Sequence, residues 1–330
     1  MSIAAGANLG RDLSELDSGD EPLFGGKSAA LGELLTAGIG VPPGFALSTE
    51  AYALAQANGG MPAAVRDECE RRYAALAGVA GVADPPVAVR SSAVGEDSAT
   101  ATFAGQQETV LWVRGVEEIC AAVLRCWASL QSELAVSYRA HLGDQREPAM
   151  GVAVQLMVDA VVSGVLFTCN PLSGDTSMVA INASWGLGLA VVGGEVTPDD
   201  YLISKVTHEV VREEVGFKAV EYVPDPEAHG VALREVPAER AHAPCLDAQA
   251  LQVLIDTARA AERHFGAPQD VEWAIARTGT LPGNLFVLQS RAVTAVGSRP
   301  EVPGEQPASA IALVMQQFGA VRGGPDATER

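Results

Sequence analysis

Arg90 stands between a short apolar run and a loop of small, hydroxyl-bearing residues. The stretch reads VAVRSSAVGEDSATATFAGQQET over residues 87–109. Small residues let a backbone fold closely over a ligand, hydroxyls donate hydrogen bonds, and a guanidinium pairs with phosphate oxygens. The pattern indicates a strand end and loop that cover a phosphate group. A solvated or ion-paired strand end is the alternative interpretation of Arg90.

Lys27 follows two glycines at the start of an apolar, helically spaced segment, FGGKSAALGELLTAG. Backbone N–H groups at a helix N-terminus attract anions, and a lysine adds positive charge. GGKS resembles the end of a P-loop, but that motif requires a glycine where this chain has Glu21, so the P-loop is excluded. Phosphate binding and a surface lysine beside a Gly-Gly turn both remain open.

Two segments near the end of the chain, DVEWAIA and NLFVLQSR, have the composition of paired strands. Period-two alternation places Leu285, Val287, Gln289 and Arg291 on one face. If the strands pair, Glu272 lies on that side as well. A carboxylate and an amide oxygen can hold Mg²⁺, while an arginine contacts the phosphates that the ion bridges. An ordinary polar sheet face is the alternative.

The surrounding chain mixes helices and strands in both halves, which predicts an α+β fold with two lobes. We expect a first lobe over 1–156, a second over 157–295 with the hinge near 155–158, and a linker and tail over 296–330. Helices are expected after Gly26 and over 50–58, 62–77, 116–142 and 247–265, the last capped by Asp247. Strands are expected over 87–90, 109–113, 151–158, 163–168 and 177–184.

Charge and cysteine usage narrow the class of protein. The chain has 330 residues, 48% of them hydrophobic, and a net charge of −19. Neither nucleic acid nor an anionic membrane suits such a surface, so an anionic ligand needs a local cluster of cations. Five widely spaced cysteines and an N-terminus without a signal-peptide pattern predict a reduced, cytoplasmic chain. The most apolar stretch, 150–169, is broken by polar residues and predicts no membrane span.

In their order along the chain these segments resemble the nucleotide-binding N-terminal part of the phosphoenolpyruvate synthase and pyruvate phosphate dikinase family. Rifampicin phosphotransferases and phenylphosphate synthases share this part. The matching stretches include GGKSAALGELLTAGIGVPPGFALSTEAY, the Arg90 segment, WGLGLAVVGGEVTPDDY and DVEW…LFVLQSR. They run from about residue 23 to 293.

The resemblance implies an ATP-grasp-like fold with ATP and Mg²⁺ held between two lobes. It implies roles for residues in four groups. The phosphate contacts are Lys27, Arg90 and Arg291; the loop over the nucleotide contains Gly105 and Thr109; the adenine neighbours are Gln155 and Met157; and the Mg²⁺ ligands are Glu272 and Gln289.

Two positions depart from the family pattern. Leu189 stands where the family often has glutamate in G-L-G-E, and Ala292 where it often has proline after Q-x-R. No function is carried onto Leu189.

Full-length members continue into a swivelling domain with a phosphorylatable histidine, and the five histidines here lie in no such motif. The resemblance therefore implies the ATP-binding subunit of a split dikinase-type phosphotransferase. ATP would be cleaved to AMP and Pi, and the β-phosphoryl would pass to a histidine on a partner subunit. A phenol or cresol is the expected final acceptor, as in an aryl phosphate synthase.

Three alternatives stay open: the nucleotide-binding half of a split phosphoenolpyruvate synthase, a non-catalytic ATP-sensing module, and a self-sufficient kinase that releases ADP. The apolar tail segment 310–318 is expected either to dock the partner or to pack on its own lobe.

Overall fold

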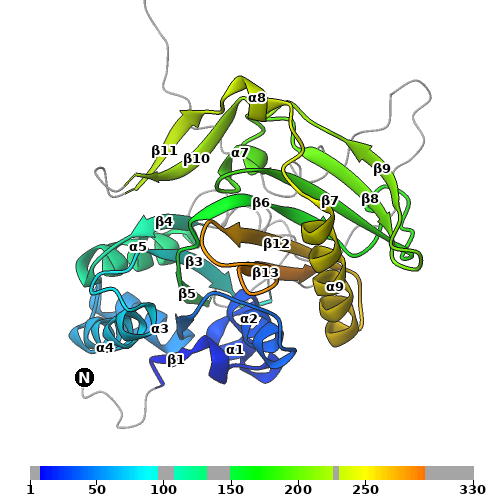
Figure 1. The fold of residues 1–330 in the computed structure, drawn as a ribbon. Helices are drawn as coiled ribbons and strands as arrows, with labels where there is room; N and C mark the ends of the chain where they lie inside the picture. Colours follow the sequence, from blue (N-terminus) through cyan, green and yellow to red (C-terminus); the bar gives the residue numbers. More distant parts are fainter. Residues whose placement is uncertain (1–7, 96–107, 132–148, 226–229, 294–330) are drawn as a thin grey trace, which may run out of the picture.

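The computed structural model describes residues 8–95, 108–131, 149–225 and 230–293, and two antiparallel sheets dominate it (Figure 1). This mixture of helix and sheet confirms the α+β class. The predictions for Gly105, for the second half of 116–142 and for 310–318 lie outside the described residues.

The first sheet has five strands in the order β1-β2-β5-β3-β4. Their bounds are Gly10–Asp12 (β1), Gly44–Leu47 (β2), Val87–Ala93 (β3), Thr109–Val113 (β4) and Met150–Leu156 (β5). β3 continues three residues past Arg90, because it pairs with β5 from Val87↔Leu156 to Ala93↔Met150. The helices of this half are α1 (Glu21–Phe24), α2 (Gly26–Thr36), α3 (Thr49–Asn58), α4 (Ala63–Ala80) and α5 (Val116–Ser129).

The second sheet has six strands in the order β13-β12-β6-β7-β8-β9. They are β6 (Ala160–Phe167), β7 (Met178–Trp185), β8 (Asp199–Ser204), β9 (Val210–Glu214), β12 (Gln269–Ala276) and β13 (Leu285–Ala292). The expected pairing of β12 with β13 is confirmed. So is the helix start at Asp247, whose side chain accepts a hydrogen bond from Ala250 N at 2.8 Å.

The remaining elements of this half are short, apart from one helix. They are α7 (Leu189–Val192), α8 (Ala238–Ala241), α9 (Ala248–Phe265) and the hairpin β10 (Val220–Asp225) with β11 (Gly230–Glu235). The hairpin lies to the left of α7 and above β4 in Figure 1, and its strand β11 contacts β4 of the five-stranded sheet. It therefore spans from one sheet toward the other.

The two sheets are joined through a shared core. Apolar side chains of η1 (Leu13–Glu15) and α2 pack in one cluster with those of β6, β7, β12, β13 and α9. Val287 N also donates to Gly40 O at 2.8 Å, so the chain after α2 runs against the β13 edge. The helix that begins at Gly26 is thus anchored on the six-stranded sheet.

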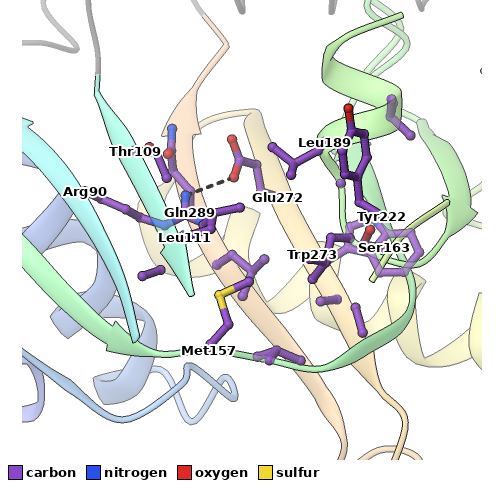
Figure 2. Close-up of a pocket in the computed structure, with 18 of the residues that line it drawn as sticks. Arg90, Thr109, Leu111, Met157, Ser163, Leu189, Tyr222, Glu272, Trp273 and Gln289 are labelled. Carbon is purple, nitrogen blue, oxygen red and sulfur yellow. Dashed lines mark hydrogen bonds and ion pairs between the residues drawn. The ribbon is translucent and has the colours of Figure 1, made fainter. Parts of the chain in front are cut away.

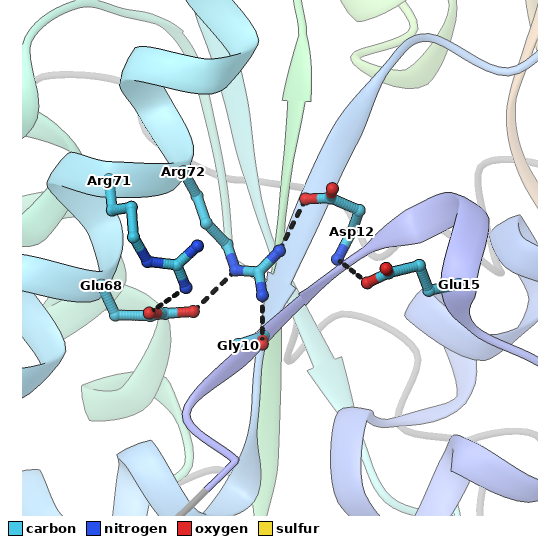
Figure 3. A network of polar contacts seen from close by, with 6 residues as sticks. All are labelled: Gly10, Asp12, Glu15, Glu68, Arg71 and Arg72. Carbon is cyan, nitrogen blue, oxygen red and sulfur yellow. Dashed lines mark hydrogen bonds and ion pairs between the residues drawn. The ribbon is translucent and has the colours of Figure 1, made fainter.

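A polar network ties α4 to the first strand (Figure 3). The Arg72 guanidinium donates to Asp12 Oδ1 at 2.6 Å, to Gly10 O at 2.6 Å and to Glu68 Oε1 at 2.7 Å. Three charge-assisted hydrogen bonds from one planar group fix α4 relative to β1. The network holds the edge strand β1 in place.

All five cysteines are free thiols, and four of them are buried. Within the described ranges every helix is too short or too polar to cross a lipid bilayer.

Candidate functional site

A pocket of about 640 Å³ lies between the two sheets. One side is lined from β3, β4 and β5, and the other from β6, β12 and β13, with further walls from residues 187–195 and Tyr222 (Figure 2). Pockets of this size suit small organic ligands. The predicted residues Arg90, Thr109, Gln155, Met157, Glu272, Gln289 and Arg291 all line it.

Arg90 and Glu272 meet across this pocket. Arg90 lies on β3 and Glu272 on β12, and Arg90 Nη1 donates to Glu272 Oε2 at 3.2 Å (Figure 2). Their side chains are only 12% and 20% exposed. Attraction between charges is stronger there than in open water. Arg90 is therefore ion-paired, as the alternative interpretation has it, but it lies within β3 and inside a pocket, and not at a strand end.

Arg291 is paired with a carboxylate that the sequence analysis missed. Asp270 lies directly opposite Arg291 across β12 and β13, and Arg291 Nε donates to Asp270 Oδ2 at 2.9 Å. Burial raises the pKa of Asp270 to about 6, while Arg291 acts in the opposite direction. The only sequence signal for Asp270 is its position two residues before Glu272, on the same strand face.

The prediction that Leu285, Val287, Gln289 and Arg291 share one face is wrong. Leu285 and Val287 pack in the core below the sheet, whereas Gln289 and Arg291 line the pocket. The cause is a β-bulge: Glu272 pairs with Gln289 and Trp273 with Val287, which leaves Leu288 as the extra residue. A bulge reverses the alternation beyond it. Gln289 and Arg291 still point the same way, toward Glu272.

Glu272 and Gln289 are direct cross-strand neighbours, so a carboxylate and an amide oxygen stand side by side. The described residues contain no group of three or more His, Cys, Asp and Glu side chains that could hold a metal ion. Mg²⁺ usually takes one or two carboxylates and completes its shell with phosphates and water. The pair fits that ion, provided that a phosphate ligand accompanies it.

Lys27 lies beneath the pocket wall and is absent from the residues that line it. It is buried, and its Nζ donates to Ser91 O at 3.1 Å. Gly25 precedes it with φ of +80° and allows the chain to approach Ser92 O, which a Cβ would meet at 1.9 Å. The surface-lysine alternative is therefore wrong. A phosphate contact by Lys27 stays a prediction.

The opposite end of the pocket is apolar. Val158, Leu187 and Ala274 pack there with the partly buried Met157 and Leu288. Gln155 is buried beside them, and its Nε2 has no hydrogen-bond partner among the described residues. An unpaired amide donor at an apolar slot suits a flat heterocycle with acceptor atoms.

Several lining residues had no predicted role. Among them are Leu189, where the family often has glutamate, and Tyr222 (Figure 2), together with Glu195. Tyr222 and Glu195 come from segments that no sequence pattern connects. Among the described histidines, His208, His242 and His264 are absent from the lining.

Residues 55–309 match the family described as "Pyruvate phosphate dikinase, AMP/ATP-binding domain". A probable phosphoenolpyruvate synthase of Staphylothermus marinus is 35% identical over 88% of this chain and 42% of its own length. The phosphoenolpyruvate synthase of Pyrococcus furiosus is 32% identical over 94% of this chain and 47% of its own length.

A relative with a different name is also similar over most of this chain. The prodigiosin synthesizing transferase PigC of Serratia marcescens is 36% identical over 84% of this chain and 32% of its own length. The chain thus spans less than half the length of these curated relatives.

Solved structures resemble it more distantly. PH1788 from Pyrococcus horikoshii aligns with a TM-score of 0.40 and 13% identity, over 84% of this chain and 94% of its own. That similarity is too low to bear on fold or function. The family match covers well over half of the sequence, and on that ground the chain belongs to the pyruvate phosphate dikinase AMP/ATP-binding domain family.

Proposed function

We propose that this chain binds ATP for a dikinase-type phosphotransferase. The observation that carries the proposal is the placement of Arg90 and Arg291, which come from opposite sheets and line one pocket. In a chain of net charge −19, such a local pair of guanidinium groups is the feature that a polyphosphate requires. The family match supports the same ligand.

The two ends of the pocket hold different parts of the nucleotide. Adenine lies in the apolar slot beside Gln155 and Met157, and the triphosphate extends toward Arg90 and Arg291. Residues 1–156 and 157–295 act as the two lobes of an ATP-grasp-like fold. Lys27, whose Nζ donates to Ser91 O, adds positive potential from below the wall, and Thr109 lines the pocket.

Glu272 and Gln289 are the residues that would hold Mg²⁺. When bound, the ion neutralises charge on the phosphates. Arg90 leaves Glu272 when a phosphate takes its place, so the carboxylate becomes available as nucleotide arrives. Catalysis by this chain consists of positioning and of charge stabilisation by the two arginines.

The phosphoryl group is transferred from the bound ATP to another protein. ATP is cleaved to AMP and Pi, and the β-phosphoryl passes to a histidine on a separate subunit that carries the swivelling domain. No described histidine of this chain lines the pocket, which supports a carrier from elsewhere. The complex works in the cytoplasm, and its final acceptor is a phenol or cresol.

A split phosphoenolpyruvate synthase is the second candidate. The relatives named phosphoenolpyruvate synthase favour it, and the pocket is the same for both acceptors. The two candidates differ only in what the partner delivers the phosphoryl to.

Labelled ATP separates these possibilities. The chain is incubated with Mg²⁺, [β-³²P]ATP or [γ-³²P]ATP, and the histidine-bearing protein encoded beside it. Acid-labile label on the partner from β-labelled ATP, with AMP as product, supports the proposal. Addition of pyruvate or of p-cresol then identifies the acceptor that discharges the label.

Other outcomes contradict it. ADP as the product identifies a self-sufficient kinase. Saturable ATP binding with no transfer identifies a sensing module. Absence of ATP binding removes the nucleotide assignment.

A further inference from the structure

One wall of the pocket carries a polar pair next to the apolar end. Tyr222 of β10 donates from its hydroxyl to Glu195 Oε1 at 2.9 Å, and both residues line the pocket. Leu189 lies between Tyr222 and Glu272 in the close-up (Figure 2). Leu189 thus separates the Tyr222–Glu195 pair from Glu272, the carboxylate that could bind a metal ion.

The backbone fixes the position of Tyr222. Leu187 N donates to Tyr222 O at 2.9 Å, and Gly186, with φ of +71°, passes so close that a Cβ would meet Tyr222 O at 2.4 Å. The hairpin that carries Tyr222 is therefore bound to the glycine-rich segment by direct backbone contact. Its ring is a fixed part of the wall.

The turn after α7 presents Glu195 to that ring. Gly193 N donates to Leu189 O at 2.8 Å and Glu195 N to Ala190 O at 3.0 Å. A tightly wound turn leaves little freedom for the glutamate backbone. Burial, together with Glu195, raises the pKa of Tyr222, so the phenol stays a hydrogen-bond donor at neutral pH.

Glu195 is an exposed residue that lines the pocket, so its carboxylate is accessible to a bound ligand. It repels a polyphosphate ligand, and the protein already carries a net charge of −19. One of its oxygens is taken by Tyr222, and its remaining lone pairs accept hydrogen bonds only. In the proposed nucleotide, the hydroxyl donors between the base and the phosphates are those of the ribose.

We propose that Glu195 accepts hydrogen bonds from the ribose hydroxyls of the nucleotide, and that Tyr222 is the positioning residue that holds its carboxylate. This inference rests on the proposed binding of ATP and adds the residues that recognise the ribose. A carboxylate is a common partner of ribose hydroxyls in nucleotide sites. The structure thereby assigns a role to a segment that the phosphate and metal residues do not explain.

The test is a ratio of affinities measured by calorimetry. ATP and 2′,3′-dideoxy-ATP are titrated into the wild-type chain and into Glu195→Ala, Tyr222→Phe and Glu213→Ala. We expect the wild type to bind ATP about tenfold more tightly than the dideoxy analogue, as for the loss of hydrogen bonds to a charged group. Glu195→Ala brings this ratio close to one by weakening ATP, with the dideoxy affinity unchanged or improved.

The other two variants test whether the change in the affinity ratio is specific to Glu195. Tyr222→Phe lowers the ratio by a smaller factor, because the carboxylate remains but is no longer held. Glu213 is exposed on β9 and does not line the pocket, so Glu213→Ala keeps the wild-type ratio.

Two results overturn the inference alone: a wild-type ratio near one, or a Glu195→Ala ratio within twofold of the wild type while ATP still binds. A wild-type chain that binds neither nucleotide overturns the proposed function and this inference together. Circular dichroism of each variant excludes a loss of folding as the cause.

Discussion

Arg90 of the five-stranded sheet and Glu272 of the six-stranded sheet form an ion pair across the pocket, with Nη1 and Oε2 3.2 Å apart. Each side chain is mostly shielded from solvent. A phosphate that binds Arg90 would therefore compete with Glu272 for the guanidinium. In the proposed function, this competition links anion binding on one sheet to the availability of the Glu272 carboxylate on the other.

Removal of Arg90 tests its role in this exchange. We predict that Arg90→Ala lowers phosphoryl transfer by about 100-fold or more, since a donor to transition-state charge is lost. Arg90→Lys retains part of the activity because the charge remains without the planar fork. Turnover is measured as AMP release. Near-normal turnover in Arg90→Ala would contradict the assignment.

The same variant leaves Glu272 without its partner. We predict that Arg90→Ala lowers the free energy of unfolding by about 1–3 kcal/mol, the cost of an unpaired, partly buried charge. Arg90→Ala/Glu272→Gln recovers most of this stability and none of the activity. Urea titration measures the first effect. Equal stabilities of the single and double variants would show that the unpaired Glu272 carboxylate is not the cause of the loss.

The requirement for Mg²⁺ tests Glu272 as a ligand. We predict that Glu272→Gln raises the Mg²⁺ concentration for half-maximal activity by about tenfold or more, because a neutral amide is a weaker ligand than a carboxylate. Chelation of Mg²⁺ abolishes transfer in every variant. Glu214→Gln, on the distant strand β9, serves as the control. An unchanged Mg²⁺ dependence would remove Glu272 from the metal site.

The bulge at Leu288 predicts different outcomes for two single-residue deletions in β13. Removal of Leu288 turns β13 into a regular strand and leaves Gln289 and Arg291 on the pocket face. We therefore expect a folded protein that binds ATP within about tenfold of the wild type, with the loss due to one apolar wall residue.

Deletion of Ser290 is the matched control. It turns Arg291 toward the core and leaves Asp270 buried without a cation, so we expect a protein that does not fold. Thermal unfolding and calorimetry compare the two. If the Ser290 deletion folds and the Leu288 deletion does not, the assigned bulge is wrong.

Glu33 connects α2 to α9 and predicts a pH dependence of stability. Ser18 N donates to Glu33 Oε1 at 2.7 Å, and His264 Nε2 contacts the other oxygen. These bonds, that of Ser18 first, hold the pKa of Glu33 below its ordinary value of 4.5. A depressed folded-state pKa adds stability above about pH 4.5, and this is lost as the pH falls through the folded-state pKa.

We predict that Glu33→Gln lowers the free energy of unfolding by about 1 kcal/mol at about pH 7. The difference from the wild type shrinks as the pH falls through the folded-state pKa, because the native carboxyl is then protonated as well. Glu235→Gln, at the exposed end of β11, is the control. A constant difference across this range would exclude the carboxylate as its source.

The elements were largely predictable from local patterns. The helix start at Asp247 and the pairing of β12 with β13 follow from capping and alternation, which act over a few residues. The bulge at Leu288 was not predictable, because it depends on how Trp273 and Val287 fit the core below the sheet. Alternation alone therefore placed Leu285 and Val287 on the same face as Gln289, although they lie on the opposite one.

The site was predictable only in part, for a related reason. Arg90, Glu272 and Arg291 could be selected by residue type and motif. Their partners could not: Asp270 has a role only once the register is known. Tyr222 and Glu195 meet because a hairpin crosses a glycine-rich turn. Such contacts belong to tertiary packing, and no spacing in the sequence encodes them directly.

The most direct test of the central claim is calorimetric titration of Mg²⁺-ATP into the wild type, Arg90→Ala and Arg90→Ala/Arg291→Ala/Asp270→Asn, with folding verified for each. The third variant avoids a buried unpaired Asp270. The account predicts saturable binding by the wild type, about tenfold weaker binding after the first change, and about 100-fold or greater weakening after the second. Equal affinity in all three proteins would contradict a triphosphate site between these two sheets.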